Sequence, residues 1–204
     1  MLDTARHLHT IYRMEATAQR PVGNEISLAW RDTLTEANLQ GVVKLVDCAT
    51  ADGGTLGYAN AMTPYQAAAF KEGLAANLQA RETHALLGSV GDQYVFFCLM
   101  TPSGMPNCCH RAELAKGVVH PSYRGRNVMP RVFRAIVSKA ESLGVEQLVL
   151  DVRDGSRAHL LWQRFGFESY GVLEDYARLG EHRFRGHYMA QNVASLKQRV
   201  SLST

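Results

Sequence analysis

The sequence lacks any apolar run long enough to span a bilayer, although 46% of its 204 residues are hydrophobic. Near the N-terminus, His7, His9 and Arg13 stand where a signal peptide would have its apolar core. The chain also has no internal repeat and no low-complexity segment. These absences argue against membrane and repeat proteins, and we expect a cytoplasmic location with no membrane partner.

The sequence also lacks a strong excess of either charge, and its cysteines lack the spacing of a metal site. The formal net charge is +3, and no Lys/Arg run is present that would indicate a nucleic-acid partner. The four cysteines, Cys48, Cys98, Cys108 and Cys109, do not follow the spacing of a zinc site. We therefore expect reduced thiols and no metal, in one domain with a full hydrophobic core.

One segment nevertheless has the features of an anion site. Residues 112–120 predict a strand, and residues 128–140 predict an amphipathic helix with Pro130 in its first turn and Asn127 as its N-cap. The short polar turn between them directs backbone N–H groups and a helix N-terminus to one point, which favours a phosphate. The motifs for nucleoside triphosphates and for dinucleotides are both absent.

A second strand and helix follow this segment. Residues 147–152 predict a buried strand, and Ser156 is a candidate N-cap for the helix after it. One face of that helix is apolar, and Gly166 is a natural C-terminal stop.

Together these segments resemble the GNAT superfamily of N-acetyltransferases, and the resemblance covers most of the chain. Residues 119–129 are similar to the acetyl-coenzyme-A loop Val-x-Pro-x-x-Arg-Gly-x-Gly-x-Gly/Ala, and residues 156–167 to Asn/Ser-x-x-Ala-x-x-Phe-Tyr-x-x-x-Gly-Phe. Segments 53–58, 111–114 and 171–177 look closest to the tabtoxin-resistance type. The resemblance implies acetyl-CoA or another acyl-CoA as co-substrate. It also implies a small amine, such as an amino-acid-like metabolite or antibiotic, as acceptor.

The remaining pattern predicts an α/β (α+β) fold. Further strands are expected at residues 26–32, 84–90, 93–101, 168–176 and 183–190, and helices at 36–49 and from Pro64, after a capping box at Thr63, to about Arg81. We expect one GNAT-like domain over residues 25–192, with a mixed, mostly antiparallel sheet of six or seven strands flanked by helices. An N-terminal helix or arm at 1–24 and a C-terminal tail at 193–204 complete the expected organisation.

Two carboxylates are candidates for the catalytic base. Acyl transfer needs such a base because an ammonium group with a pKa of about 10.4 is protonated at neutral pH. Glu113 is the first candidate, since it begins the strand that leads to the loop, and the resemblance implies a catalytic role for the matching glutamate. Asp151, at the carboxyl end of the neighbouring strand, is the second. The structural alternatives are that Glu113 is an exposed residue or pairs with Arg111, and that Asp151 caps the loop before Ser156 or pairs with Arg153.

The expected cofactor site combines main-chain and side-chain groups. The main chain of two valines would pair with the pantetheine arm as an added strand, and the loop N–H groups would hold the pyrophosphate. The predicted cofactor-binding residues are Val118, Val119, Arg124, Gly125, Arg126, Asn127, Val128, Met129, Ser156 and Trp162. Asn127 and Met129 replace small residues of the family loop. Trp162 stands where many members have a tyrosine that is thought to protonate the thiolate, and an indole cannot do this.

The acceptor pocket is expected beside residues 53–65, with Tyr58, Tyr65 and Tyr176 as substrate-binding residues. The altered loop and the tryptophan leave open a catalytically silent acyl-CoA-binding or regulatory module, and an acyltransferase that uses a longer acyl donor. We interpret His159 and His187 as packing or surface residues. The oligomeric state is not fixed by the sequence, which leaves a homodimer open.

Overall fold

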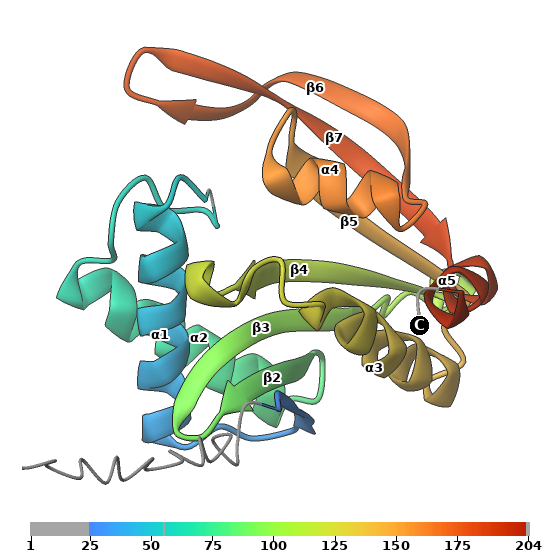
Figure 1. Ribbon diagram of the computed structural model, residues 1–204, viewed down its shortest axis with the longest axis horizontal. Helices are drawn as coiled ribbons and strands as arrows, with labels where there is room; N and C mark the ends of the chain where they lie inside the picture. Colours follow the sequence, from blue (N-terminus) through green and yellow to red (C-terminus); the bar gives the residue numbers. More distant parts are fainter. Residues whose placement is uncertain (1–24, 55, 203–204) are drawn as a thin grey trace, which may run out of the picture.

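The structure, a computed structural model, describes residues 25–54 and 56–202 (Figure 1). This part of the chain forms one seven-stranded sheet in the order β1-β2-β3-β4-β5-β7-β6. The strands are β1 (Ser27–Arg31), β2 (His84–Val90), β3 (Gln93–Pro102), β4 (Arg111–Val119), β5 (Gln147–Arg153), β6 (Glu168–Leu179) and β7 (His182–Asn192). The helices are α1 (Glu36–Ala51), α2 (Pro64–Gln79), α3 (Val128–Ser142), α4 (Arg157–Arg164) and α5 (Val193–Ser201). The arm expected at residues 1–24 lies outside the described residues.

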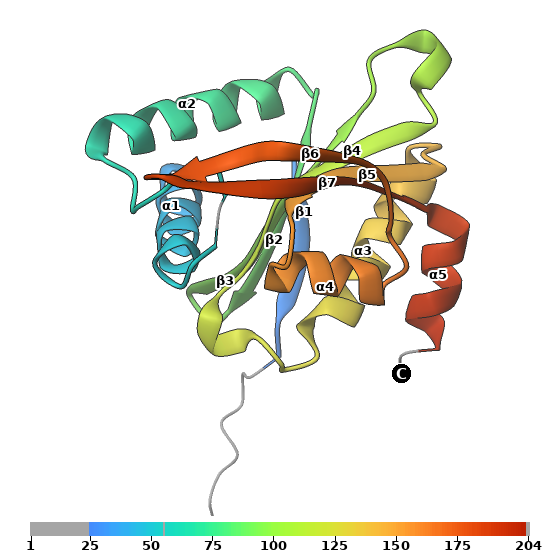
Figure 2. The ribbon, with the colours of Figure 1, turned by 90° about the horizontal axis from the view of Figure 1, so that it is seen from above.

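Helices cover both faces of the sheet. Helices α1 and α2 pack on one face through one cluster of buried apolar residues, and α3 and α5 pack on the other through a larger cluster (Figure 2). Strand pairing is antiparallel except between β4 and β5. The expected single α/β domain with a mostly antiparallel sheet is therefore confirmed. Within the described ranges, no helix combines the length and apolar character needed to cross a bilayer.

Side-chain caps begin several of these helices. The Thr63 hydroxyl accepts a hydrogen bond from the Gln66 N–H, and the Gln66 side chain accepts one in return, as the capping box predicts. Ser156 likewise accepts from the His159 N–H at 3.1 Å. The expected side-chain cap at Asn127 is wrong, because this residue has a left-handed backbone (φ 56°) and its side chain makes no capping hydrogen bond. A side-chain cap requires an extended backbone at that position.

The C-terminal residues correct a second expectation. Residues 193–201, expected as part of a tail, form α5, and the Asn192 side chain caps this helix by accepting from the Ala194 N–H at 2.9 Å. Val193, Leu196 and Val200 join the cluster beneath α3. Their spacing places them on one face of a helix, so this segment buries an apolar stripe and belongs to the domain.

The parallel pair in the centre of the sheet separates along its length. Only three residue pairs join the two strands, Arg111–Glu113 on β4 with Gln147–Val149 on β5. Beyond them, β4 keeps β3 on one side, and no strand of the described residues pairs with its other side, while β5 remains paired with β7 as far as Arg153. The ends of β4 and β5 therefore diverge, as Figure 1 shows.

The buried position of α5 is tested by replacing Leu196 with alanine. We expect Leu196→Ala to lower the free energy of unfolding by about 2–5 kcal/mol, because the fully buried side chain leaves a cavity. Leu202→Ala is the matched control, since Leu202 is 87% exposed, and it should change the free energy by less than about 0.5 kcal/mol. Urea denaturation measures both. Equal effects of the two substitutions would contradict the placement of α5 in the core.

Candidate active site

A cleft with a volume of about 1400 Å³ lies between the diverging ends of β4 and β5. One wall is formed by β4 from Glu113 onward and by the turn that leads into α3. The opposite wall comes from the end of β5 and the first turns of α4. Residues 52–54, 56 and 57, in the loop after α1, complete the lining together with Tyr176 of β6. Segments far apart in the sequence thus share one cleft.

The two predicted carboxylates both line this cleft. On each strand, the residues before and after the carboxylate are buried in the cluster beneath α3 and α5 or in close contact with it. Because side chains alternate along a strand, Glu113 and Asp151 both project to the opposite face of the sheet. The structure therefore brings both candidates to the same side of the divergence.

Asp151 is held by Tyr176, whose hydroxyl donates a hydrogen bond to its carboxylate. The pairing of β6 with β7 is shifted between Leu173 and Ala177, which allows Tyr176 to lie across β7 over Gly186. A Cβ atom at Gly186 would lie 2.1 Å from the tyrosine ring, so only glycine permits this arrangement. Burial, followed by the bond to Asp151, raises the pKa of Tyr176 above its usual value, which keeps the phenol protonated.

The ion pairs considered as alternatives for the carboxylates are not observed among the described residues, although Glu113 is exposed. Asp151 does not pair with Arg153, which instead donates to the Gly53 carbonyl at 3.1 Å. Within residues 25–54 and 56–202, the Glu113 side chain has no hydrogen-bond or ion-pair partner, and Arg111 forms no pair with it. Glu113 thus offers a free carboxylate at the end of the cleft where β4 and β5 begin to separate.

Lys116 is a cleft residue that the sequence reasoning missed. It has a left-handed backbone (φ 55°) at an irregularity where the register between β3 and β4 shifts. Its Nζ donates to the Leu56 carbonyl at 2.8 Å and lies 5.8 Å from the centre of the Tyr58 ring. Burial lowers the pKa of Lys116, and the nearby Asp151 carboxylate opposes this effect. The sequence does carry one indication of this role, because Lys116 is a charged residue in an otherwise apolar part of the strand.

The predicted cofactor residues converge on the cleft with one exception. The lining includes Val118, Val119, Arg124, Gly125, Asn127, Val128, Met129, Ser156 and Trp162. Gly125 and Asn127 have positive φ angles of 73° and 56°, which curve the main chain into a tight turn before α3. Arg126 does not line the cleft, and its guanidinium lies 5.1 Å from the centre of the Tyr123 ring.

Two arginines already converge on one anionic group at the cleft. Arg124 forms a hydrogen bond and ion pair with the Asp52 carboxylate, and Arg157 Nη1 lies 2.9 Å from the same oxygen. The hydrogen bond from Arg124 holds the pKa of Asp52 below its usual value. This carboxylate joins the loop after α1 to the opposite side of the cleft. The arginines are therefore placed to receive a phosphate if Asp52 moves away.

The predicted acceptor tyrosines separate into two groups. Tyr176 lines the cleft, but Tyr58 and Tyr65 do not. Tyr65 is 83% exposed at the start of α2, and Tyr58 packs edge-on against Phe70 beside α1 and α2. Tyr58 still approaches the site indirectly, because its ring lies beneath the Lys116 ammonium.

Comparisons with known proteins agree with this geometry. The acetyltransferase (GNAT) family model matches residues 60–167, and a search of curated protein sequences finds no match. Similar solved structures include an N-acetyltransferase from Staphylococcus aureus Mu50, with a TM-score of 0.65 and 15% identity over 82% of this chain and 99% of that chain. The ribosomal-protein-S18-alanine N-acetyltransferase from Escherichia coli has a TM-score of 0.61 and 16% identity, with 83% and 94% covered. The ribosomal-protein-alanine N-acetyltransferase from Brucella melitensis has a TM-score of 0.63 and 19% identity, with 80% and 99% covered.

The arginine pair is tested with inorganic pyrophosphate, measured by calorimetry at low salt. We expect Asp52→Asn to tighten pyrophosphate binding roughly twofold to fivefold, because an exposed carboxylate no longer competes for Arg124 and Arg157. Asp92→Asn, in the exposed turn between β2 and β3, is the matched control and should leave the affinity unchanged. Weaker binding by Asp52→Asn would mean that Asp52 positions the arginines rather than competing for them.

Proposed function

The chain belongs to the acetyltransferase (GNAT) family, whose model covers residues 60–167, and from this premise we propose which reaction it performs. The protein transfers an acetyl group from acetyl-CoA to the amine of a small amino-acid-like metabolite or antibiotic. The observation that carries this proposal is the cleft between β4 and β5, where the turn before α3 and two carboxylates on one sheet face meet.

The residues present fit an acyl-CoA. The pyrophosphate would accept hydrogen bonds from main-chain N–H groups between Arg124 and Met129, at the N-terminus of a 15-residue helix. Arg124 and Arg157 add charge, as their shared contact with Asp52 indicates. The edge of β4 that lacks a strand partner would pair with the pantetheine arm near Val118 and Val119. The thioester would then lie close to the carboxylates.

Glu113 is the proposed base, because its carboxylate is free of partners and lines the cleft. It would take a proton from the acceptor ammonium, directly or through one water. The neutral amine then attacks the thioester carbonyl, the C–S bond breaks, the thiolate leaves, and the nitrogen releases its extra proton to solvent water. A thiol with a pKa of about 8.5 leaves readily as the thiolate, so no dedicated acid is required.

Asp151 and Tyr176 would orient the acceptor. Their hydrogen bond fixes the direction of the carboxylate, and its second oxygen remains available for an ammonium group. Because the pKa of Tyr176 is raised, its phenol is a poorer proton donor to a thiolate than an ordinary tyrosine. Lys116 holds the Leu56 carbonyl and so fixes the loop that forms the acceptor side of the cleft.

The resemblance to the tabtoxin-resistance type favours a small acceptor. Two of the similar structures are named for alanine of ribosomal proteins, so a protein amine is the competing acceptor. A panel of free amino acids and short peptides with N-terminal alanine, scored by thiol release from acetyl-CoA, separates the two classes.

The division of roles between the carboxylates predicts different kinetic effects. Glu113→Gln should lower kcat/KM by about a hundredfold to ten-thousandfold and flatten its acidic limb, because the base is lost. Asp151→Asn should raise the KM for the acceptor more than it lowers kcat. Both are measured by thiol release from acetyl-CoA between about pH 4 and 9, a range that includes the ordinary pKa of a glutamate, about 4.3, and of an α-amino group, about 7.7–8.0.

Glu141→Gln is the matched control, since Glu141 lies on α3 and pairs with Lys197 away from the cleft. An unchanged pH profile in Glu113→Gln, with a large loss of kcat in Asp151→Asn, would reverse the two roles. CoA binding by calorimetry without turnover of any amine would show a catalytically silent module. Neither binding nor turnover would overturn the proposal.

A longer acyl donor is the second candidate, favoured by a small apolar cavity of about 40 Å³. This cavity lies between β3, β4, α3 and α4, and its lining shares Gly117, Met129 and Trp162 with the cleft. Its walls are apolar side chains, which suit an acyl chain better than water. It could therefore receive the carbons that extend beyond an acetyl group.

Replacing Gly117 with alanine tests this second candidate. A Cβ atom there meets only the Trp162 ring, at an ordinary contact distance of 3.5 Å, so it narrows the space without a clash. If the cavity takes the chain, Gly117→Ala should lower kcat/KM for butyryl-CoA about tenfold more than for acetyl-CoA. Gly73→Ala, on α2 with open space around it, is the control. Equal losses with both donors would exclude the cavity as a chain site.

A further inference from the structure

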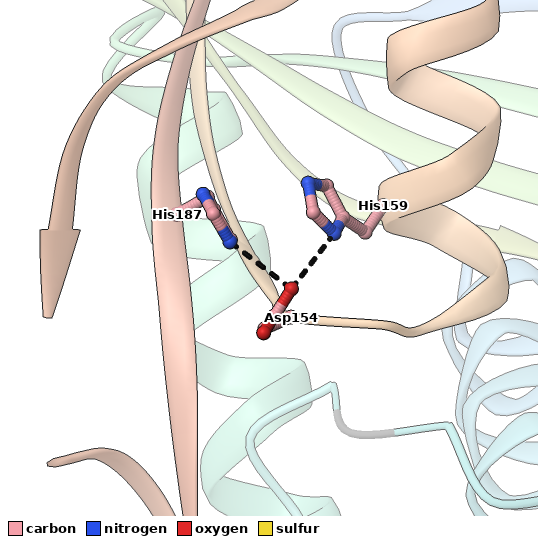
Figure 3. A group of neighbouring side chains, drawn as sticks. All are labelled: Asp154, His159 and His187. Carbon is pink, nitrogen blue, oxygen red and sulfur yellow. Dashed lines mark hydrogen bonds and ion pairs between the residues drawn. The ribbon is translucent and has the colours of Figure 1, made fainter. Parts of the chain in front are cut away.

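Three side chains outside the cleft lining converge behind α4 (Figure 3). Asp154 follows β5, His159 lies in the first turns of α4, and His187 comes from β7. His159 Nδ1 lies 3.4 Å and His187 Nε2 lies 3.1 Å from the same oxygen of Asp154. One potential ligand atom from each residue lies within 4.8 Å of the other two.

The hydrogen bonds around the histidines direct lone pairs toward this point. His159 Nδ1 accepts from the Gly155 N–H at 3.2 Å, so in the neutral ring the proton is on Nε2. Within the described part of the chain, that buried Nε2 has no hydrogen-bond partner. His187 Nε2 is hydrogen-bonded to Asp154 at 3.1 Å, and it becomes able to coordinate when the ring proton is on Nδ1, which lies 3.0 Å from the Ser169 hydroxyl.

These distances suit a tetrahedral cation. With Zn²⁺ bonds of about 2.0–2.2 Å, neighbouring ligand atoms in a tetrahedron lie roughly 3.3–3.5 Å apart. Two of the three distances between ligand atoms, 3.1 and 3.4 Å, are close to this value, and the third, between the two nitrogens, is at most 4.8 Å. We propose that Asp154, His159 and His187 form a Zn²⁺ site with a fourth position for water. A set of two imidazoles and one carboxylate favours Zn²⁺ over Mg²⁺ or Ca²⁺, which take oxygen ligands.

Three features of the surroundings limit the affinity. The Arg185 guanidinium contacts the other oxygen of Asp154 at 2.9 Å and brings a positive charge close to the cation. The imidazole rings are stacked with an interplanar angle of 24°, so the cation must tilt them to draw both lone pairs to one point. The Gly155 N–H must also give up its hydrogen bond to His159. The site is therefore expected to bind Zn²⁺ reversibly.

The position of the site gives the cation a structural effect. Gly155 and Ser156, next to Asp154, line the cleft, and Ser156 caps α4. A cation bound by these three residues would fasten the loop after β5 and the start of α4 to β7. It would thus fix the β5 side of the cleft without contacting the reacting groups.

The test is a titration with Co²⁺, which reports tetrahedral coordination by its intense visible absorption, followed by displacement with Zn²⁺. The full chain is used with its exposed thiols alkylated, because Cys48 and Cys109 are exposed. His7 and His9 are replaced by alanine in every protein, because they are neighbouring histidines elsewhere in the sequence. The compared proteins are this background, His187→Ala, Asp154→Asn and His182→Ala.

We expect the background and His182→Ala to bind one tetrahedral Co²⁺ that Zn²⁺ displaces. His182 is the matched control because it is an exposed histidine on the same strand, β7. His187→Ala and Asp154→Asn should weaken this binding at least about tenfold. Zn²⁺ should also raise the unfolding midpoint of the background and not of these two variants.

Equal Co²⁺ binding in all four proteins, or none in the background, would overturn the proposal and leave a hydrogen-bonded network around Asp154. Far-UV circular dichroism checks that each variant is folded, and His187→Gln is used in place of His187→Ala if that variant does not fold. The titration contains no acyl-CoA, so its outcome is independent of the proposed transferase activity.

Discussion

The parallel pairing of β4 with β5 over only three residue pairs is the constraint on which the site depends. Main-chain N–H and C=O groups require hydrogen-bond partners, and beyond Glu113 no strand within residues 25–54 and 56–202 pairs with the β5 side of β4. Such an edge inside a sheet is a ready template for an extended ligand with amide groups. The large apolar clusters on both faces hold the two parts of the sheet in place.

The placement of the candidate functional groups depends on the segments that follow β4 and β5 at this separation. β4 leads into a tight turn and the N-terminus of α3, while β5 leads to α4 and to the arginine that shares Asp52 with Arg124. The groups proposed to bind the pyrophosphate thus lie at the open end, and both carboxylates project from one face of the same strands. The shifted pairing of β6 with β7 then brings Tyr176 to Asp151, with Gly186 making room for the ring. In the proposed transferase, binding of the pyrophosphate and the acyl transfer therefore take place at different points along one cleft.

The sequence predicted what depends on local pattern. The seven strands, the capping box at Thr63 and the cap at Ser156 follow from periodicity and from polar side chains at helix starts. The short helix α5 was missed because nine residues carry a weak periodic signal. Lys116 and the Asp154, His159 and His187 cluster were missed because their neighbours come from distant segments, and no spacing encodes them. The positions of Tyr58 and Tyr65 could not be predicted, because the orientation of these side chains depends on tertiary packing with residues distant in the sequence.

The central claim is that acyl-CoA occupies the cleft between β4 and β5, and a crystal structure of the protein with CoA tests it most directly. The account predicts the pyrophosphate at the main-chain N–H groups between Arg124 and Met129 and the pantetheine arm alongside Val118 and Val119. The sulfur should then lie between the diverging strands, on the face that carries Glu113 and Asp151. CoA bound on the opposite face of the sheet, or outside the cleft, would contradict it.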